Sequence, residues 1–154
     1  MAGERLRGRR VLVVEDDALI AMLIEEVLRE HGATVSGPLG EPEAALRAAE
    51  TEPCDLALLD VHLGRTSSAD IARRLRARGV PLAFVTGYGR GGLPEAFQDA
   101  AVLGLGHDQQ ARAHPTIGGE GGHQLFGQLT ADEHQGIAVV HRLVEGLLAG
   151  VTAP

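Results

Sequence analysis

The sequence predicts an α/β fold built around a parallel β-sheet. Short apolar runs recur through the first two thirds of the chain, and segments with helically spaced apolar residues separate them. The apolar runs lack an alternation of polar and apolar residues, as is typical of parallel strands buried on both faces. Intervening helical segments of about ten residues suit the right-handed crossover that joins parallel strands. We therefore expect a doubly wound sheet with helices on both faces.

The first strand and helix are predicted within residues 11–30. Residues 11–14 are all apolar and form the first strand. A helix is expected over residues 18–30, because its leucines, isoleucine and valine recur at helical spacing, and His31-Gly32 ends it. Asp17 is expected to cap this helix. A cluster of arginines before the strand is interpreted as a solvated N-terminal arm: Arg5, Arg7, Arg9 and Arg10.

The next elements continue the alternation. Residues 34–36 form a weak strand that Gly37-Pro38 is expected to stop. Pro42 suits the first position of a small helix that extends to residue 49, because its missing N–H would have no helical partner there.

The second half of the expected domain repeats the pattern. Residues 56–59 form the third strand, and Ser67 or Ser68 caps a helix that runs to residue 78. Residues 82–86 form a fourth strand, and residues 101–104 are the candidate for a fifth. The predicted order is 2-1-3-4-5, that of a flavodoxin-like doubly wound sheet, and ligands bind at the carboxyl ends of its strands.

Carboxylates end two of the expected strands. Glu15 and Asp16 follow the first strand, and Asp60 closes the third. In the order 2-1-3-4-5 these strands are neighbours at the point where the strand order reverses. Adjacent carboxylates repel one another unless a cation lies among them, which predicts a divalent metal site. An aspartate can also accept a phosphoryl group, so the pattern indicates a phosphorylation switch, although a single such aspartate can equally be a helix cap or loop contact.

These motifs carry a resemblance to the receiver domain of two-component response regulators over residues 10–103. The acidic pair at 15–16, Asp60 and Thr86 fall where that family has its functional residues. Residues 81–88 are similar to the Phe-Ala-Thr-Gly-Tyr signature of a mainly alphaproteobacterial subgroup of stand-alone receivers. That subgroup works with histidine kinases of the HWE type.

The resemblance implies a mechanism and a set of roles. Asp60 would take the phosphoryl group from a phosphohistidine of the kinase. Asp16, Asp60 and the backbone carbonyl of His62 would hold Mg²⁺, and Glu15 would act directly or through water. Thr86 would hydrogen-bond a phosphoryl oxygen. The added charge would bias a surface contacted by a downstream protein, formed by the fourth helix, fifth strand and last helix.

One feature departs from the family. Receivers carry a Lys-Pro pair after the fifth strand, and Leu105 and Gly106 stand in its place. All 14 basic residues are arginine, so the chain contains no lysine to substitute. Arg90 is expected in the loop after Thr86. Its guanidinium is planar and spreads its charge over several N–H donors, so it does not directly replace the compact ammonium group of a lysine.

The C-terminal third is atypical. Residues 105–130 are rich in glycine and are predicted as a long loop. A capping box at Thr130–Glu133 then opens a predicted amphipathic helix over residues 131–150. Its apolar residues are spaced by three and four: Ile137, Val140, Val144, Leu147 and Val151. This helix could replace the last receiver helix, form a homodimer seam, or do both.

Two other patterns are interpreted as incidental. Residues 87–92 match G-x-G-x-x-G, but a dinucleotide-binding domain would place this motif in its first strand–helix unit and continue into a second half. The histidines of the C-terminal third lack the short spacings of a zinc site.

Composition indicates the cellular compartment and the classes of partner to expect. A chain of 154 residues with 44% hydrophobic residues suits one domain, and its net charge of −7 disfavours nucleic acid and anionic membranes. The single Cys54 excludes a disulfide framework, and no apolar run is long enough to span a membrane, so we expect a cytoplasmic protein.

The sequence therefore favours a stand-alone phosphoacceptor receiver, a signalling protein and not an enzyme, with Mg²⁺ as its cofactor. The alternative is a pseudo-receiver that has kept the fold as a phosphorylation-independent interaction or dimerisation module, as the missing lysine suggests. A small hydrolase using the same carboxylates is disfavoured, because the chain lacks the lysine and the cap domain of such enzymes.

Overall fold

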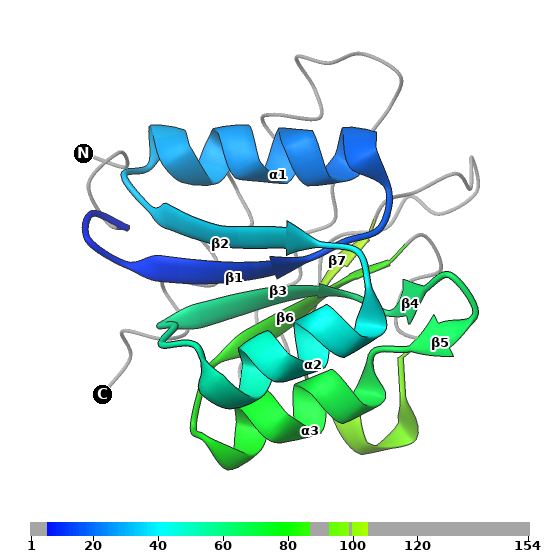
Figure 1. The fold of residues 1–154 in the computed structure, drawn as a ribbon. Coiled ribbons are helices and arrows are strands. Elements are labelled where there is room, and N and C mark those ends of the chain that lie inside the picture. The colour runs from blue at the N-terminus through cyan, green and yellow to red at the C-terminus, as the bar shows by residue number, and fades with distance from the viewer. Residues whose placement is uncertain (1–5, 87–92, 99, 105–154) are drawn as a thin grey trace. The chain divides into compact units, whose positions relative to one another are not determined.

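A five-stranded sheet organises the computed structural model, which describes residues 6–86, 93–98 and 100–104 (Figure 1). The strands are β1 (Arg10–Val14), β2 (Thr34–Leu39), β3 (Leu56–Asp60), β6 (Leu82–Thr86) and β7 (Ala101–Gly104). Their order is β2-β1-β3-β6-β7, which confirms the predicted flavodoxin-like order 2-1-3-4-5. β1 pairs in parallel with both β2 and β3, and β6 pairs in parallel with β7.

The chain divides into two compact units within β6, between Leu82 and Ala83. The first unit contains the helices α1 (Ala18–Glu30), α2 (Pro42–Thr51) and α3 (Ala69–Ala77). α1 contacts β1 and β2 on one side of the strands, and α2 and α3 pack together on the other side (Figure 1). The first unit is therefore wound on both faces, as the sequence predicts.

The described part of the second unit is small. A 3-10 turn at Glu95–Phe97 precedes β7, and its Phe97 ring meets Phe84 of β6 edge to face, with ring centres 5.5 Å apart. Such aromatic pairs add about 0.5–1.5 kcal/mol to the stabilisation from burial. The residues described between β6 and β7 contain this turn and no α-helix, so the fourth helix that the family resemblance implies is not found in this part of the chain.

β1 is buried along its apolar length. Its four apolar residues, 11–14, are each at most 1% exposed. Burying one such side chain stabilises the fold by about 1.5–3 kcal/mol, so the strand is a major part of the hydrophobic core. This burial places the end of β1, where Glu15 and Asp16 follow, in a fixed position.

The helix α1 has the predicted bounds and cap. Asp17 Oδ1 accepts hydrogen bonds from the backbone N–H groups of Leu19 and Ile20, at 2.9 and 3.1 Å. The buried face of the helix consists of Ala21, Ile24, Val27 and Leu28. On its other side Leu19 and Met22 are large apolar side chains that remain 59% and 55% exposed.

β2 is longer than predicted. The expected stop at Gly37-Pro38 is wrong, because the strand continues to Leu39 with a register shift against β1 between Leu12 and Val14. β2 lies at the edge of the sheet and has a partner on one side only, which is where a strand tolerates a proline. Gly37 has a φ of +102°, a conformation that other residues rarely adopt.

Two arginines, one in α3 and one at its C-cap, form polar contacts with α2. Arg74 pairs with Glu50 at 2.8 Å, and Arg78 donates to the backbone oxygens of Ala49 and Glu52 at the end of α2. These carbonyls have no partner within their own helix, so Arg78 satisfies groups that would otherwise need water. α2 ends at Thr51, two residues beyond the predicted end.

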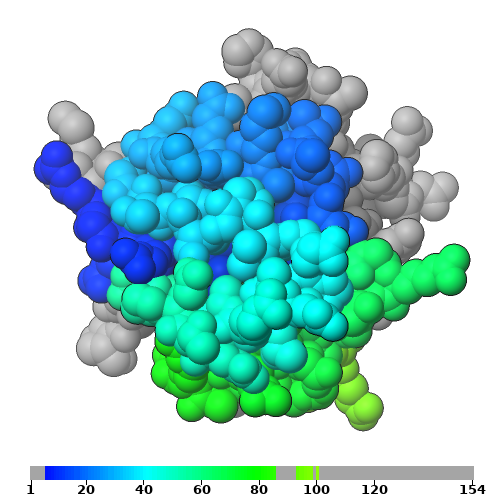
Figure 2. Space-filling model, in the orientation of Figure 1, coloured from blue at the N-terminus to red at the C-terminus, as the bar shows by residue number. Residues whose placement is uncertain are grey.

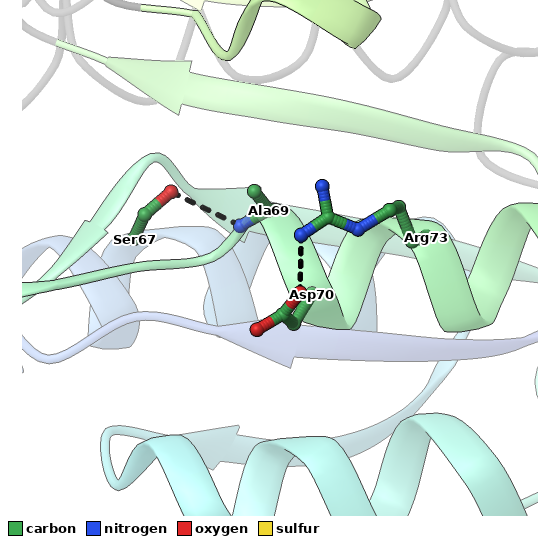
Figure 3. A network of polar contacts seen from close by, with 4 residues as sticks. All are labelled: Ser67, Ala69, Asp70 and Arg73. Carbon is green, nitrogen blue, oxygen red and sulfur yellow. Dashed lines mark hydrogen bonds and ion pairs between the residues drawn. The ribbon is translucent and has the colours of Figure 1, made fainter.

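The start of α3 uses two serines differently (Figure 3). Ser67 Oγ accepts a hydrogen bond from the backbone N–H of Ala69 at 3.2 Å, and Asp70 pairs with Arg73 one turn along the helix. Ser68 is the N-cap residue by position, but its buried hydroxyl donates to the carbonyl of Val61 instead. Ser68 therefore holds the predicted N-cap position without a side-chain cap bond, and Ser67 bonds the first helical amide from the residue before the cap.

The backbone of the N-terminal arm is anchored to the fold, although its described arginines are exposed. Leu6 is 1% exposed, and its carbonyl accepts the N–H of Arg9. The carbonyl of Arg9 in turn accepts the N–H of Thr34 at the start of β2. The arginines at 7, 9 and 10 are exposed, as expected, while Arg5 lies outside the described residues.

The long loop predicted over 105–130 and the helix predicted over 131–150 also lie outside the described residues. Within the part of the chain that the structure describes, no helix is long and apolar enough to cross a membrane.

Candidate functional site

Three carboxyl groups meet where β1 and β3 end. Val14 and Leu59 are paired in the parallel ladder, so the residues that follow them leave the sheet side by side. Glu15, Asp16 and Asp60 each bring a carboxylate oxygen into a cluster whose atoms lie within 4.8 Å of one another. The structure thus brings together the acidic residues that the sequence analysis singled out.

Glu15 is the buried member of the cluster, with 4% of its surface exposed. Its Oε1 accepts the backbone N–H of Asp17 at 3.0 Å, whereas its Oε2 is buried and has no hydrogen-bond partner among the described residues. Burial raises the pKa of Glu15 from 4.5 to about 8, and the charges of Asp60 and Asp16 add to this rise. In the absence of a cation, Glu15 therefore stays largely protonated at neutral pH.

Asp60 and Asp16 are held by backbone amides of the segment that follows β3. Asp60 is half-buried, and its Oδ1 accepts the N–H of His62 at 3.3 Å. Burial raises the pKa of Asp60. Asp16 is exposed, and its Oδ2 accepts the N–H of Gly64 at 2.9 Å. Burial acts to raise the pKa of Asp16 too, but hydrogen bonds with the Gly64 amide and with the carboxyl groups of Asp60 and Glu15 lower it overall.

The cluster fits a hard divalent cation such as Mg²⁺. Mg²⁺ prefers oxygen ligands, takes one or two carboxylates and keeps several waters. The unpartnered Oε2 of Glu15 is a buried acceptor beside two further carboxylates, and a cation would satisfy it and favour its ionised form. The donor set and the orphaned oxygen both agree with the metal that the sequence predicted.

The remaining predicted residues are placed less completely. Thr86 ends β6 and lies opposite Gly104 of β7, but its side chain is not among the described ones. The backbone amide of His62 contacts Asp60, and the role of its carbonyl as a metal ligand stays a prediction. Asp17 is the cap of α1, as expected, and is not part of the cluster. Arg90 and the G-x-G-x-x-G segment lie outside the described residues.

The sequence analysis missed a small hairpin beside the cluster. Strands β4 (His62–Leu63) and β5 (Thr66–Ser67) pair antiparallel around a two-residue turn of Gly64 and Arg65. Gly64 has a φ of +61°, which suits the first position of such a turn. The signal was present as a glycine between two short segments, but two-residue strands show no periodicity that would reveal them.

Comparison with known proteins agrees with the fold. Residues 11–104 match the family model described as the response regulator receiver domain. The chain is 34% identical over 96 residues to the transcriptional regulatory protein PdtaR of Mycobacterium tuberculosis, covering 62% of this chain and 47% of PdtaR. It is 39% identical over 79 residues to the DNA-binding response regulator MtrA of Mycobacterium leprae, covering 51% of this chain and 35% of MtrA. The match therefore spans about half or less of these curated relatives.

Solved structures show the same likeness. The BeF₃-activated conformation of SdrG from Pseudomonas melonis Fr1 is 33% identical, with a TM-score of 0.53 over 65% of this chain and 86% of SdrG. The response regulator PhyR from Brucella abortus has a TM-score of 0.62 over 97% of this chain and 51% of PhyR. At 21% identity the PhyR likeness speaks for the fold alone.

Proposed function

The chain belongs to the response regulator receiver domain family, and from this premise we propose that it accepts a phosphoryl group on Asp60 from a histidine kinase and signals through protein contacts. The observation that carries the proposal is the cluster of Glu15, Asp16 and Asp60 at the adjoining ends of β1 and β3. Asp60 is half-buried, so its carboxylate is partly desolvated and still open to a donor. Three adjoining carboxyl groups, one of them with a buried and unpartnered oxygen, are better explained by a bound cation than by a structural role.

The proposed chemistry is a direct transfer. An Asp60 carboxylate oxygen attacks the phosphorus of the donor's phosphohistidine, the P–N bond breaks, and its electron pair stays on the imidazole nitrogen. Asp16 and Asp60, with the carbonyl of His62 and with Glu15, would hold Mg²⁺, which neutralises charge on the phosphoryl group when bound. The hydroxyl of Thr86 would donate a hydrogen bond to a phosphoryl oxygen of the product.

The surface beside the site supports a protein partner. α1 begins directly after the acidic residues and exposes Leu19 and Met22, which lie three residues apart and therefore on one face of the helix. We infer that this apolar pair contributes to the contact with a kinase, since exposed large side chains next to a reacting group favour docking of a protein donor. The resemblance of residues 81–88 to the Phe-Ala-Thr-Gly-Tyr signature supports a kinase of the HWE type.

A pseudo-receiver is the second candidate. The observation that favours it is the lack of any lysine in the chain, since the family pairs a lysine with the phosphoryl group. In that case the fold would act as a phosphorylation-independent interaction or dimerisation module, and the predicted helix over 131–150 would form the seam between two copies.

Intact-mass measurement after incubation with Mg²⁺ and acetyl phosphate separates the two candidates. We expect the wild type to gain one phosphoryl group and Asp60→Asn to gain none. Asp70→Asn is a matched control, because Asp70 is an exposed aspartate of α3 outside the cluster. An adduct that persists in Asp60→Asn contradicts the assignment of Asp60. No adduct in any variant, with Mg²⁺ still bound to the wild type, favours the pseudo-receiver.

A further inference from the structure

We propose that Arg65, at the tip of the β4–β5 hairpin, supplies the positive charge that faces the phosphoryl group on Asp60. This inference rests on the proposed phosphorylation of Asp60 and assigns a further residue to that reaction. It addresses the absence of lysine from the chain, in which the side chains that are positively charged at every physiological pH are all arginines.

The hairpin holds the backbone of Arg65 next to the acidic cluster. Gly64 N–H donates to Asp16 Oδ2 at 2.9 Å, so the turn lies against a member of the cluster. Arg65 is the next residue, and its Cα is about 3.8 Å from that of Gly64. The guanidinium sits at the end of a long, flexible side chain, which gives it a wide reach from this position.

The base of the hairpin is fixed as well as its tip. Val61 and Leu63 are 1% and 3% exposed. The carbonyl of Val61 accepts both the backbone N–H and the hydroxyl of Ser68, at 3.0 and 3.1 Å. The hairpin projects from the surface beside the end of β3, in green at the right of Figure 2. Arg65 is therefore carried by an anchored element and not by an unstructured loop.

Arg65 is also uncommitted, unlike several other arginines of this part of the chain. Arg29, Arg73 and Arg74 form ion pairs with glutamate or aspartate. Within the described residues, no hydrogen bond or ion pair engages the exposed side chain of Arg65. No existing contact of the Arg65 guanidinium is therefore lost when it turns toward a phosphoryl group. A guanidinium can donate two parallel hydrogen bonds to such a group.

The chemistry requires a cation at this place. When the P–N bond of the donor breaks and the Asp60 O–P bond forms, the single charge of the Asp60 carboxylate is replaced by the nearly two negative charges of an acyl phosphate, beside the carboxyl groups of Glu15 and Asp16. One divalent cation does not balance this charge. Arg65 would donate to the phosphoryl oxygens that do not contact the metal, stabilising both the transfer and the acyl phosphate product.

The test compares Arg65→Gln, Arg65→Lys and Arg47→Gln with the wild type. Arg47 is a matched control, because it is an exposed arginine of α2 whose side chain also has no partner among the described residues. We expect Arg65→Gln to slow phosphorylation by acetyl phosphate and Mg²⁺ about tenfold or more. This is less than the roughly hundredfold loss for a buried oxyanion-hole donor, because the side chain of Arg65 is exposed to water. Arg65→Lys should stay within about threefold of the wild type, because lysine also binds phosphate as a point charge. Arg47→Gln should match the wild type.

A second readout does not depend on turnover. Beryllofluoride mimics the phosphoryl group, and its binding in the presence of Mg²⁺ can be followed by NMR. We expect Arg65→Gln to weaken beryllofluoride binding about tenfold while leaving the affinity for Mg²⁺ alone undiminished. Equal behaviour of Arg65→Gln and Arg47→Gln in both assays overturns the role of Arg65. A wild type that takes up neither phosphoryl group nor beryllofluoride refutes the proposed function itself, and the role of Arg65 falls with it.

Discussion

Glu15 combines burial, a raised pKa and an oxygen without a partner among the described residues. Its protonation should therefore contribute measurably to the free energy of unfolding. Its pKa in the folded protein is about 8, against 4.5 as the ordinary value. Between these two values the folded state binds more protons than the unfolded state, so the free energy of unfolding falls as pH rises. The stability that the protonated Glu15 contributes is complete below about pH 4.5 and is lost as pH rises through about 8.

We expect Glu15→Gln to flatten this pH dependence in metal-free protein. Glutamine keeps the shape of the protonated carboxyl group and cannot ionise, so the variant should be more stable than the wild type at pH 8 and similar to it at pH 5. Urea unfolding in the presence of a chelator, at both pH values, measures the difference. Parallel pH profiles for wild type and variant would show that Glu15 does not ionise in this range.

Gly37 is a second residue whose identity the backbone requires. A Cβ atom at this position would lie 2.6 Å from the carbonyl oxygen of Val13, in a backbone with a φ of +102°. We expect Gly37→Ala to lower the free energy of unfolding by about 3 kcal/mol or more, because strain and overlap add. Gly79→Ala is the control, since Gly79 has a φ of +73° but nothing within 4 Å of the added atom, and should cost about 1–2 kcal/mol. Equal losses in denaturant unfolding would mean that the contact with Val13 relaxes.

At the scale of elements, α1 depends on its cap. Asp17 accepts two backbone N–H groups at the start of this helix, and Asp17→Ala would leave both without a side-chain partner. We expect a loss of about 1 kcal/mol in the free energy of unfolding, with Asp17→Asn within about 0.5 kcal/mol of the wild type because its amide oxygen still accepts. An equal loss of unfolding free energy in both variants would indicate that α1 is stabilised by the negative charge near its start and not by the cap hydrogen bonds.

The elements differ in how far the sequence predicts them, and the reasons are physical. β1 and α1 are predicted with nearly correct bounds, because four buried apolar residues and the Asp17 cap are local signals. The predicted end of β2 is wrong. Gly37-Pro38 is a local signal for the end of a strand, but β2 lies at the edge of the sheet, where a proline is tolerated and the strand can continue. The β4–β5 hairpin is missed, because its strands of two residues owe their position to contacts made elsewhere in the fold.

The same distinction applies to the candidate site. The meeting of Glu15, Asp16 and Asp60 follows from strand order and from the carboxyl ends of two strands, both of which the sequence predicts. The hydrogen bond between Asp16 and Gly64 joins residues 48 positions apart and has no sequence signal. Nor does any pattern reveal which arginine stands near the cluster when the expected lysine is absent.

At the scale of the whole molecule, metal binding and folding should be linked. A ligand that binds only the folded state stabilises it by about 2.7 kcal/mol at one hundred times its Kd, which raises Tm by about 5–10 °C for a chain of this size. We expect Mg²⁺ to produce such a shift in thermal unfolding, and to do so more strongly at pH 8 than at pH 5, because protons compete for Glu15 and Asp60.

Asp16→Asn tests whether this stabilisation arises at the cluster. The variant removes one ligand charge while its side-chain oxygen still accepts the Gly64 amide, so the hairpin contact remains. Its Tm should respond to Mg²⁺ much less than that of the wild type. An undiminished shift would place the cation elsewhere on the protein.

The Gly64–Asp16 hydrogen bond also makes the hairpin a spectroscopic reporter. The amide proton of Gly64 is bonded to a carboxylate of the cluster, so whatever withdraws electron density from Asp16 weakens that bond. Its resonance in a proton–nitrogen correlation spectrum should shift when Mg²⁺ binds and when the cluster changes protonation. The amide resonance of Gly79, where an added Cβ would meet nothing within 4 Å, should not shift. One labelled glycine would thus report the occupancy of the site directly, before a kinase or a downstream protein is known.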